Sequence, residues 1–585
     1  MPSFFFMLPH LIGFCLFIGW IFPFYGLPIY SFYQEWLGGT LLCACFFFAI
    51  WNRKSKRALV VPMVAWAVLG LFAVGVVQSL LGMHPYPPAI ALYGVAGVLF
   101  WMAVILGANM KPAQRGTCTG LDQNFLVISR WILASAVLSA VITLLQVINW
   151  DIHLFPLVRS PDLTMNRPSA NLSQPNLMTL QLVMGLVVLG WMYVEGKISP
   201  AVSASIVTLI AVAVFFANTR AYLLMLGGLA VFSWKIESPR ANIVRWWVCV
   251  LLPIIFIVSA PFHESVMGSL GHAGRNSLNM TAQTDGRWKI WGATIQMIQA
   301  HPMLGVGLGA YSVGFYDQAT SLYGTIGATG NAHNIFLQII AECGLFAGIV
   351  ILMLALLWMF KAFKSKEKAN SIIFCNAAIA AILAHSLVEF PLWYIFFLIP
   401  FGFFLGITSG VKLKKACKIK IEKKYSFTGI IVAIILSSWI YIDYSKIREF
   451  FENAVTIGNT SAIEELQQYN KPSWLSWHLN YAKFLFMSEE ENSLEKIWIA
   501  GRETAPRFPF SKGLMRFAYV SASTDHLGAA QKALAVMYRM RPMAYKAFKV
   551  EINEACPNES QMDTPYCKLK QISNQLSMEF YNTAN

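Results

Sequence analysis

One stretch of the chain, residues 285–344, is polar and glycine-rich although hydrophobic segments flank it on both sides. It contains Gly286-Arg287-Trp288-Lys289-Ile290-Trp291, then His301-Pro302-Met303-Leu304-Gly305-Val306-Gly307-Leu308-Gly309, and it ends with Ala332-His333-Asn334, nine mostly apolar residues and Gly344. Each flanking segment is long enough to cross about 30 Å of hydrocarbon as a helix. Because titratable groups at a membrane boundary are candidates for function, the stretch is predicted to hold the functional site.

The composition of the 585 residues assigns the chain to the membrane proteins. Apolar residues make up 57% of it, charged residues only 12%, and the mean hydropathy is +0.55. A soluble protein has about 25% charged residues. Apolar runs recur between short polar breaks and predict about 13 transmembrane helices. The predicted spans are near residues 4–24, 36–51, 59–80, 89–108, 125–148, 177–194, 201–217, 221–234, 246–262, 345–360, 370–388, 391–409 and 427–443.

Lysine and arginine are distributed unevenly among the breaks between these spans. The even-numbered breaks carry 21 of them and the odd-numbered breaks carry six. The net charge of +15 is therefore not a nucleic-acid-binding patch. The positive-inside rule instead places the N-terminus and the even breaks in the cytoplasm, and the odd breaks outside. The first run lacks a basic n-region and a cleavage site, so we expect it to remain as a helix.

The composition after residue 444 is that of a soluble domain. Residues 462–470, 474–486 and 529–539 have helical spacing of apolar residues. We therefore predict an all-α polytopic membrane protein with a transmembrane domain, residues 1–444, that includes a large external loop, 263–344. An external helical domain follows at 445–585. Tetratricopeptide-like helix pairs would suit its length, although no 34-residue repeat is visible.

Two of the ten cysteines, Cys556 and Cys567, lie in this predicted external domain. An oxidising compartment favours a disulfide between them. A metal site would need more ligands than these two thiols. No His-Glu-x-x-His motif or acidic metal-binding pair occurs either, so we expect neither a metal nor a cofactor.

Three residues of the predicted external breaks suit an anionic headgroup whose tail lies in the bilayer. Arg220, in the short turn after residue 217, lies at the edge of the hydrocarbon, where an unpartnered arginine costs up to about 3 kcal/mol. Together with Arg287, it offers guanidinium groups that bind phosphate oxygens bidentately. The imidazole of His333 can accept a proton from a hydroxyl nucleophile.

Each of these residues also has a purely structural interpretation. Arg220 could be a boundary residue that reaches to the headgroups, Arg287 a solvated loop charge, and His333 a helix-capping residue. A functional and a structural role both stay open for five other polar residues of these breaks: His84, His301, His385, Glu35 and Glu389. The spacing of Gly305, Gly307 and Gly309 imitates a dinucleotide-binding fingerprint, but no strand precedes it, so a tight turn is predicted.

Several motifs resemble the superfamily of O-antigen ligases, O-antigen polymerases and bacterial protein O-oligosaccharyltransferases. Its signature is His, then Asn, Ser or Gln, nine residues, Gly, two residues, and Gly, Thr or Tyr. His333, Asn334 and Gly344 match it, whereas Ala347 occupies the last position. Further similar segments are Ala217-Asn218-Thr219-Arg220, which is close to a Thr-x-Ser-Arg turn, Gly286-Arg287 with Trp291, residues 301–309, and Gln174-Pro175-Asn176. The segment His385-Ser386-Leu387-Val388-Glu389-Phe390-Pro391-Leu392-Trp393-Tyr394 and the external domain are similar to the protein-glycosylating branch.

The resemblance implies en bloc transfer of an oligosaccharide from undecaprenyl diphosphate to a serine or threonine of a secreted protein such as pilin. It places the enzyme in the bacterial inner membrane, among membrane lipids, with the C-terminal domain periplasmic and contacting the acceptor. Arg220 and Arg287 would hold the diphosphate and His333 would act as the base, without a metal. The residues that it assigns to substrate binding are Arg167, Gln174, Asn176, Asn334, Lys289, His84, Glu35, His385 and Glu389.

Two other activities stay open. One is a ligase that passes O-antigen to lipid A core, or a polymerase of the same superfamily. The other is a transporter, although we find no inverted repeat in the hydropathy and no pair of interrupted helices at mid-membrane, which are the usual signs of a substrate path.

Overall fold

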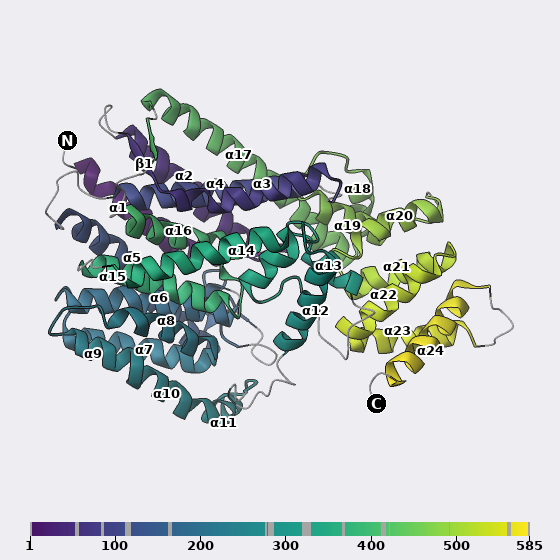
Figure 1. The fold of residues 1–585 in the computed structure, drawn as a ribbon. Coiled ribbons are helices and arrows are strands. Elements are labelled where there is room, and N and C mark those ends of the chain that lie inside the picture. Colours follow the sequence, from purple (N-terminus) through teal and green to yellow (C-terminus); the bar gives the residue numbers. More distant parts are fainter. Residues whose placement is uncertain are drawn as a thin grey trace. The chain divides into compact units, whose positions relative to one another are not determined.

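The computed structural model describes residues 3–52, 58–83, 87–110, 119–161, 167–172, 174–274, 278, 286–318, 329–365, 369–410, 417–420, 422–490, 492–557 and 563–582. The chain divides into two compact units. Figure 1 labels their helices and strands. Unit 1 comprises Met1–Gly70, Gly94–Thr281 and Met353–Trp439. Unit 2 comprises Leu71–Tyr93, Ala282–Leu352 and Ile440–Asn585. The glycine-rich stretch and the C-terminal segment thus belong to one unit, together with residues 71–93, and the rest of the chain before the stretch belongs to the other.

Unit 1 is a bundle of apolar helices. Its elements are α1 (Ser3–Ile21), α2 (Phe32–Trp51), β1 (Leu59–Val61), α4 (Pro87–Asn109), α5 (Thr119–Val147), α6 (Pro175–Val194), α7 (Pro200–Ala217), α8 (Ala221–Ser233), α9 (Ala241–Trp246), α10 (Leu252–Ser259), α11 (His263–Ser269), α15 (Asn370–Ser386), α16 (Ile395–Gly410) and β2 (Cys417–Ile419). The middle of the bundle is α6, whose side chains from Leu177 to Val194 are all buried. It packs against α5, α7, α8 and α15.

Unit 2 contains the glycine-rich stretch and the C-terminal helices. Its elements are α12 (Gly286–Ala300), α13 (Tyr311–Gln318), α18 (Thr460–Gln468), α19 (Ser476–Phe486), α20 (Leu494–Thr504), α21 (Ser511–Ser523), α22 (Leu527–Met540), α23 (Pro542–Ala555) and α24 (Pro565–Asn582). Four helices have residues in both units: α3 (Ala67–Leu80), α14 (Ile335–Phe363), α17 (Lys423–Phe450) and α4, whose residues 87–93 belong to unit 2.

The apolar helices agree with the prediction of a polytopic membrane protein. Among the described residues, nine helical segments are long and apolar enough to cross a membrane. Four shorter apolar helices, Met7–Ile21, Ala221–Ser233, Asn370–Ser386 and Ile395–Ser409, coincide with the other predicted spans. A length below 18 residues leaves these four short of a full crossing by themselves, so the number of 13 spans stays a prediction.

The sequence predicted an all-α protein, but the structure also contains two short strands. Strand β1 pairs with β2 in an antiparallel two-stranded sheet, with Val60 opposite Lys418. The side chain of Asn109 completes the edge of β1, since it accepts from Val60 N at 3.0 Å and donates to Val60 O at 2.9 Å. Sequence inspection missed the sheet because its two strands have three residues each and lie far apart in the chain.

Hydrogen bonds join the even-numbered breaks of unit 1 to one another. The sheet brings together the second, fourth and twelfth breaks. The fourth, sixth, eighth and tenth breaks are joined by Ser371 Oγ to Asp122 Oδ1 (2.8 Å), Asn370 Nδ2 to Glu195 Oε1 (2.8 Å), Arg240 Nη1 to Tyr193 O (3.0 Å) and Lys235 Nζ to Ser365 O (2.9 Å). All six even breaks therefore lie at one end of the bundle.

The odd-numbered breaks meet in the same way. Their links are Gln34 Nε2 to Asn171 O (2.8 Å), Asn171 Nδ2 to Ile21 O (2.7 Å), Arg167 Nη1 to Ala217 O (2.7 Å), Asn176 Nδ2 to Glu389 Oε1 (2.5 Å), His263 Nε2 with Phe216 O (3.1 Å) and His272 Nε2 with Val147 O (2.7 Å). Since each helix connects an odd break to an even one, these two sets lie at opposite ends of unit 1. Which end faces the cytoplasm stays a prediction.

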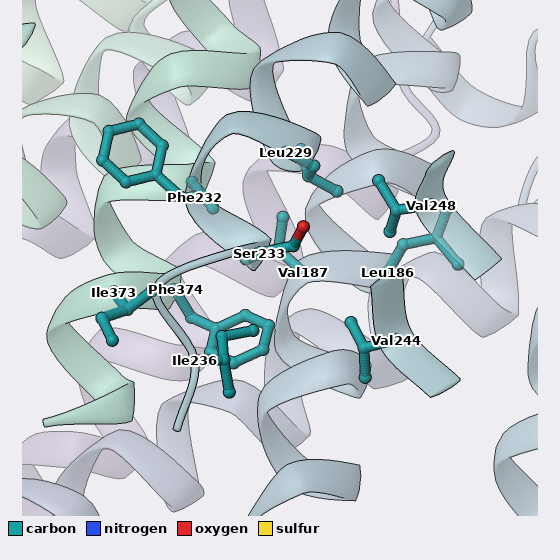
Figure 2. Close-up of a pocket in the computed structure, with 11 residues that line it drawn as sticks. Leu186, Val187, Leu229, Phe232, Ser233, Ile236, Val244, Val248, Ile373 and Phe374 are labelled. Atoms are coloured by element: carbon teal, nitrogen blue, oxygen red, sulfur yellow. The ribbon is translucent and has the colours of Figure 1, made fainter. Parts of the chain in front are cut away.

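A small pocket near the even end is lined almost entirely by apolar side chains from α6, α8 and α15 and the segment after α8 (Figure 2). The single side-chain oxygen in its lining belongs to Ser233, and it donates to Ala230 O at 2.8 Å. Because the lining has no charged group, this pocket is unsuited to binding a diphosphate.

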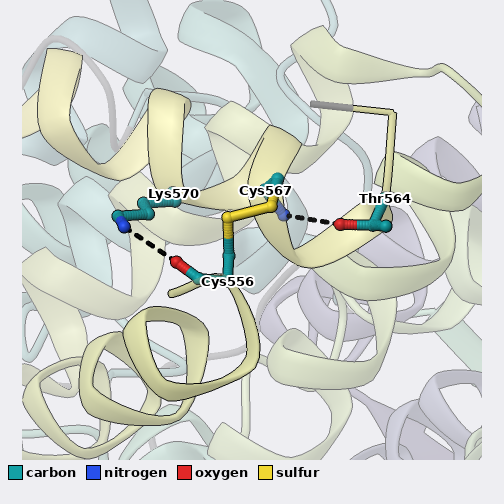
Figure 3. The surroundings of a disulfide bond; sticks show 4 residues. All are labelled: Cys556, Thr564, Cys567 and Lys570. Atoms are coloured by element: carbon teal, nitrogen blue, oxygen red, sulfur yellow. Dashed lines mark hydrogen bonds between the residues drawn. A yellow bond between two sulfur atoms is a disulfide. The ribbon is translucent and has the colours of Figure 1, made fainter. Parts of the chain in front are cut away.

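In the C-terminal segment each helix from α18 to α24 packs against the next one. The last two helices are also joined covalently, since Cys556 and Cys567 form a disulfide with their Cα atoms 5.2 Å apart (Figure 3). Lys570 Nζ donates to the carbonyl oxygen of Cys556 at 2.8 Å beside it. The helical character of the segment agrees with the prediction. That its helices form tetratricopeptide-like pairs stays a prediction.

Candidate functional site

At the odd end of unit 1, the turn between α7 and α8 is held by an arginine from another break. Asn218 ends α7 in the left-handed conformation with φ 43°, which exposes carbonyl groups that the helix does not use. Arg167 Nη1 donates to Ala217 O at 2.7 Å, to Asn218 O at 3.0 Å and to Thr219 Oγ1 at 3.2 Å. Arg167 thus fixes the turn that carries Arg220.

A row of amides and one carboxylate continues from this turn. Thr219 Oγ1 donates to Asn176 Oδ1 at 3.1 Å, and Asn176 Nδ2 donates to Glu389 Oε1 at 2.5 Å. Gln174 Nε2 lies 3.4 Å from the other oxygen of Glu389. Glu389 is 1% exposed. The structure therefore brings together Arg167, Gln174, Asn176 and Glu389, four of the predicted substrate-binding residues, through hydrogen bonds with one another or with the turn of residues 217–219.

Two more predicted residues, Glu35 and His385, lie in the odd-numbered breaks. Ser31 Oγ donates to Glu35 Oε1 at 2.5 Å. His385 is fully buried at the end of α15, where its carbonyl accepts from Glu389 N at 2.9 Å. Such burial favours the structural interpretation of His385.

Arg220 is half-buried at the residue that precedes α8, and its carbonyl accepts from Leu223 N at 3.1 Å. A helix N-terminus favours negative charge, so an anion beside Arg220 would gain from both the guanidinium and the helix dipole.

Another cation of the odd end, Arg159, was not singled out from the sequence. Its guanidinium carbon lies 4.1 Å from the ring centre of Tyr25 and 5.8 Å from that of Tyr30. Burial lowers its pKa, although the two tyrosines oppose this. Its aromatic partners come from a different break, so only the folded chain reveals the stack.

In unit 2, His333 stands in a strained turn directly before α14. Its φ of 49° is rare for a residue with a side chain, and its N–H donates to Asn331 Oδ1 at 3.1 Å. Asn334 Oδ1 accepts from Phe336 N and Leu337 N, both at 3.1 Å, so this side chain caps α14. The matching pair of the signature thus places a histidine in an unusual conformation at a capped helix end.

The glycine of the signature has an equally local reason. At Gly344 the helix α14 is interrupted, with φ 85° and ψ 169°. Leu345 N, which would bond to Ala341 O in an unbroken helix, donates instead to Pro302 O at 2.9 Å, and Ala341 O accepts from Val306 N at 2.8 Å. The interruption therefore makes room for the loop 301–309.

The amides of this loop are used inside the protein. Gly307 N donates to Glu342 O at 3.0 Å, and Leu308 N donates to Gln78 Oε1 at 2.8 Å. Gly305, Gly307 and Gly309 all have positive φ angles. A phosphate-binding loop must present its N–H groups to the ligand, so the structure confirms a tight turn and excludes a dinucleotide site here.

Helix α12 connects Arg287 to the histidine turn. Trp291 Nε1 donates to Ala332 O at 3.0 Å. Arg287 lies four residues earlier in the same helix and therefore shares the face of Trp291. Lys289 is exposed and, two residues from each of them, lies on another face. Arg287 is thus the cation of α12 that its helix directs toward the turn of His333.

The structure does not relate all the predicted residues to each other. Arg220 belongs to unit 1, whereas Arg287 and His333 belong to unit 2. His84 lies outside the described residues. No group of three or more His, Cys, Asp or Glu side chains that could hold a metal occurs in the described part of the chain.

Sequence reasoning passed over Gln78, Gln338 and Glu342, although three polar residues in apolar helices were a visible signal.

Comparisons with known proteins agree with these features. Residues 204–352 match the family described as O-antigen ligase, and residues 373–552 match the family described as virulence factor membrane-bound polymerase, C-terminal. The chain is 24% identical over 400 residues to a general O-oligosaccharyltransferase of Acinetobacter baylyi, which covers 67% of each chain. It is also 24% identical over 326 residues to a ComP-specific O-oligosaccharyltransferase of the same organism, covering 52% of this chain and 56% of the relative. The chain is therefore a membrane protein that acts in glycan transfer. It belongs to the O-antigen ligase superfamily and is related to the O-oligosaccharyltransferases of that superfamily.

Proposed function

We propose that the protein transfers an oligosaccharide en bloc from undecaprenyl diphosphate to a serine or threonine hydroxyl of an exported protein such as a pilin. The odd-numbered breaks would face the periplasm of a bacterial inner membrane. The observation that carries this proposal is the turn of His333. A histidine with a positive φ, a capped helix and a glycine-induced interruption occur within the segment that matches the O-antigen ligases.

In this mechanism His333 is the general base. The acceptor hydroxyl gives its proton to the imidazole and its oxygen forms a bond with the anomeric carbon. The bond between that carbon and the diphosphate oxygen breaks, and the electron pair leaves with undecaprenyl diphosphate. A single displacement inverts the anomeric carbon. Arg287, which belongs to the same unit as His333, would stabilise the negative charge that develops on the leaving group, which is where fixed cations lower a barrier most. The resemblance assigns the same task to Arg220.

The row from Arg167 to Glu389 supports the position of Arg220 in this proposal. Arg167 holds the backbone of the turn, and Thr219 connects it to Asn176. Three residues of this row, Glu389, Gln174 and Asn176, would either form hydrogen bonds with the glycan or hold the turn of Arg220 in position. We also propose substrate contacts for Glu35, Lys289 and Asn334. The burial of His385 instead favours a structural role for this residue.

The test is transfer by the purified full-length protein in lipid nanodiscs. It receives undecaprenyl-diphosphate-linked glycan with one of three acceptors: a pilin-like protein, lipid A core, or none. We expect glycan on the protein, and we expect His333→Ala to reduce the rate by at least about 100-fold. His301→Ala is the matched control, because His301 is an exposed histidine of the same unit.

Other outcomes would contradict the proposal. Glycan found only on lipid A core would identify a ligase, and elongated lipid-linked glycan without an acceptor would identify a polymerase. Unchanged transfer by His333→Ala would remove the imidazole from the mechanism.

A further inference from the structure

Helix α14 contains a buried carboxylate that the mechanism above does not use. Glu342 is 1% exposed, although it lies in a 29-residue helix of otherwise mostly apolar residues. A helix that only has to span a membrane gains nothing from such a group, because burying a charge costs several kcal/mol. Glu342 is therefore expected to have a specific task, and its hydrogen bonds indicate which one.

Two donors meet the same oxygen of Glu342. Gln338 Nε2 donates to Glu342 Oε1 at 2.9 Å, and Tyr311 N donates to it at 3.2 Å. Gln338 is itself 2% exposed, and its other end, Oε1, accepts from Ala332 N at 2.6 Å. A continuous hydrogen-bonded path thus runs from Glu342 through one side-chain amide to the residue before His333.

The peptide groups on both sides of Ala332 are fixed. Gln338 holds the N–H on one side, and Trp291 holds the C=O on the other at 3.0 Å. The second of these peptide groups joins Ala332 to His333. The two contacts therefore fix the backbone directly before His333, which has a φ of 49°.

A carboxylate is the group best suited to one end of this path. The amide of Gln338 has a donor end and an acceptor end, and it could bind in either orientation. Glu342 Oε1 accepts from Gln338 Nε2 and from Tyr311 N, so it draws Nε2 toward itself and leaves Gln338 Oε1 for Ala332 N. A side chain without an oxygen in place of Glu342 would remove this partner of Nε2, and the amide could then turn its NH₂ group toward Ala332 N and leave that donor unsatisfied.

We propose that Gln338 and Glu342 are positioning residues for the proposed base: the carboxylate orients the amide, and the amide holds the backbone that presents His333. This inference rests on the proposed function for its catalytic consequence. Its structural content, the hydrogen bond at Ala332, can be measured independently of any activity.

The first measurement is amide hydrogen exchange of the full-length protein, read from a peptide that covers residues 331–335. Glu342→Met keeps the length of the side chain but removes both oxygens, and we expect exchange at Ala332 to become about tenfold faster or more. Gln338→Met is a second variant that removes the amide but leaves Glu342 in place for Tyr311 N, so the test survives if Glu342→Met does not fold. The control is Tyr311→Phe, which removes the 2.7 Å hydrogen bond to Thr294 but leaves the path from Glu342 intact.

The second measurement uses the conservative variant Glu342→Gln. Both donors meet Oε1, so an amide that keeps its oxygen at this position still accepts from Gln338 Nε2 and from Tyr311 N. We expect this variant to keep slow exchange at Ala332, although Glu342→Met speeds it. If the side chain at 342 only filled space, the two variants would behave alike.

In the transfer assay, Glu342→Met should lower kcat by about tenfold or more while KM for the lipid-linked donor stays near its original value, because the path ends at the base. Glu342→Gln should keep most of kcat. Wild-type exchange at Ala332 in Glu342→Met, or equally fast exchange in Glu342→Gln, would overturn the inference. If His333→Ala itself transfers glycan normally, the proposed function fails, and the exchange data still decide whether the path exists.

Discussion

Replacing Gly344 by alanine tests the physical reason for the glycine of the signature. The backbone there has φ 85° and ψ 169°, a combination that is essentially restricted to glycine and costs other residues about 1–3 kcal/mol. A Cβ would also collide with the carbonyl oxygen of Met303, and it would lie 2.6 Å from Met303 C and 3.0 Å from Leu304 N. These neighbours are backbone atoms of the loop 301–309, so they cannot rotate away.

The two effects together predict a destabilisation of about 2–6 kcal/mol, of which overpacking contributes about 1–3 kcal/mol. The free thiol of Cys343, 2% exposed and adjacent to the substitution, offers a local probe. In Gly344→Ala we expect a thiol reagent to label Cys343 at least about 30-fold faster, as measured by mass spectrometry of its peptide in the full-length protein.

The matched control is Gly292→Ala in the same unit. No heavy atom lies within 4 Å of a Cβ built at Gly292, which is an exposed position inside α12. Alanine there should stabilise the helix by about 0.5–1 kcal/mol and leave the labelling of Cys343 unchanged or slower. Wild-type labelling in Gly344→Ala, or equal effects of the two substitutions, would refute the reasoning.

Two further predictions concern the C-terminal helices. Burial and the nearby charge of Arg507 lower the pKa of His478 from its ordinary 6.5 to about 3, so folding favours the neutral form. The contribution of His478 to the free energy of unfolding is therefore complete above pH 6.5 and falls by about 1.4 kcal/mol per pH unit below it. Exchange of the α19 amides should therefore quicken from pH 6.5 to pH 5 beyond its intrinsic change, and His478→Leu should lose this dependence; a wild-type slope in that variant would contradict the burial argument. Removing the disulfide by Cys556→Ser with Cys567→Ser should cost about 3 kcal/mol from loop closure and expose α24 to protease, whereas unchanged cleavage would show that packing alone holds the helix.

The sequence by itself determined the class of the molecule and its motifs. Transmembrane helices depend on the summed transfer free energy of neighbouring residues, so apolar runs predicted their places without any tertiary contact. The charge of the breaks predicted which ends of these helices face the cytoplasm, and the hydrogen bonds of unit 1 group the even and the odd breaks at separate ends. The local spacing of His333, Asn334 and Gly344 likewise indicated the superfamily, because a helix cap and a helix interruption are properties of a short segment.

Only the tertiary structure decided which polar side chains meet. Asn176 and Glu389 are separated by 213 residues, and Gln78 and Glu342 by 264, yet each pair forms a hydrogen bond. Such a pairing depends on the path of the whole chain, whereas sequence inspection judges a residue by its neighbours. For this reason Glu342 could be read from the sequence only as a polar residue in an apolar helix. Its task became visible when folding placed Gln338, Tyr311 and Ala332 around it.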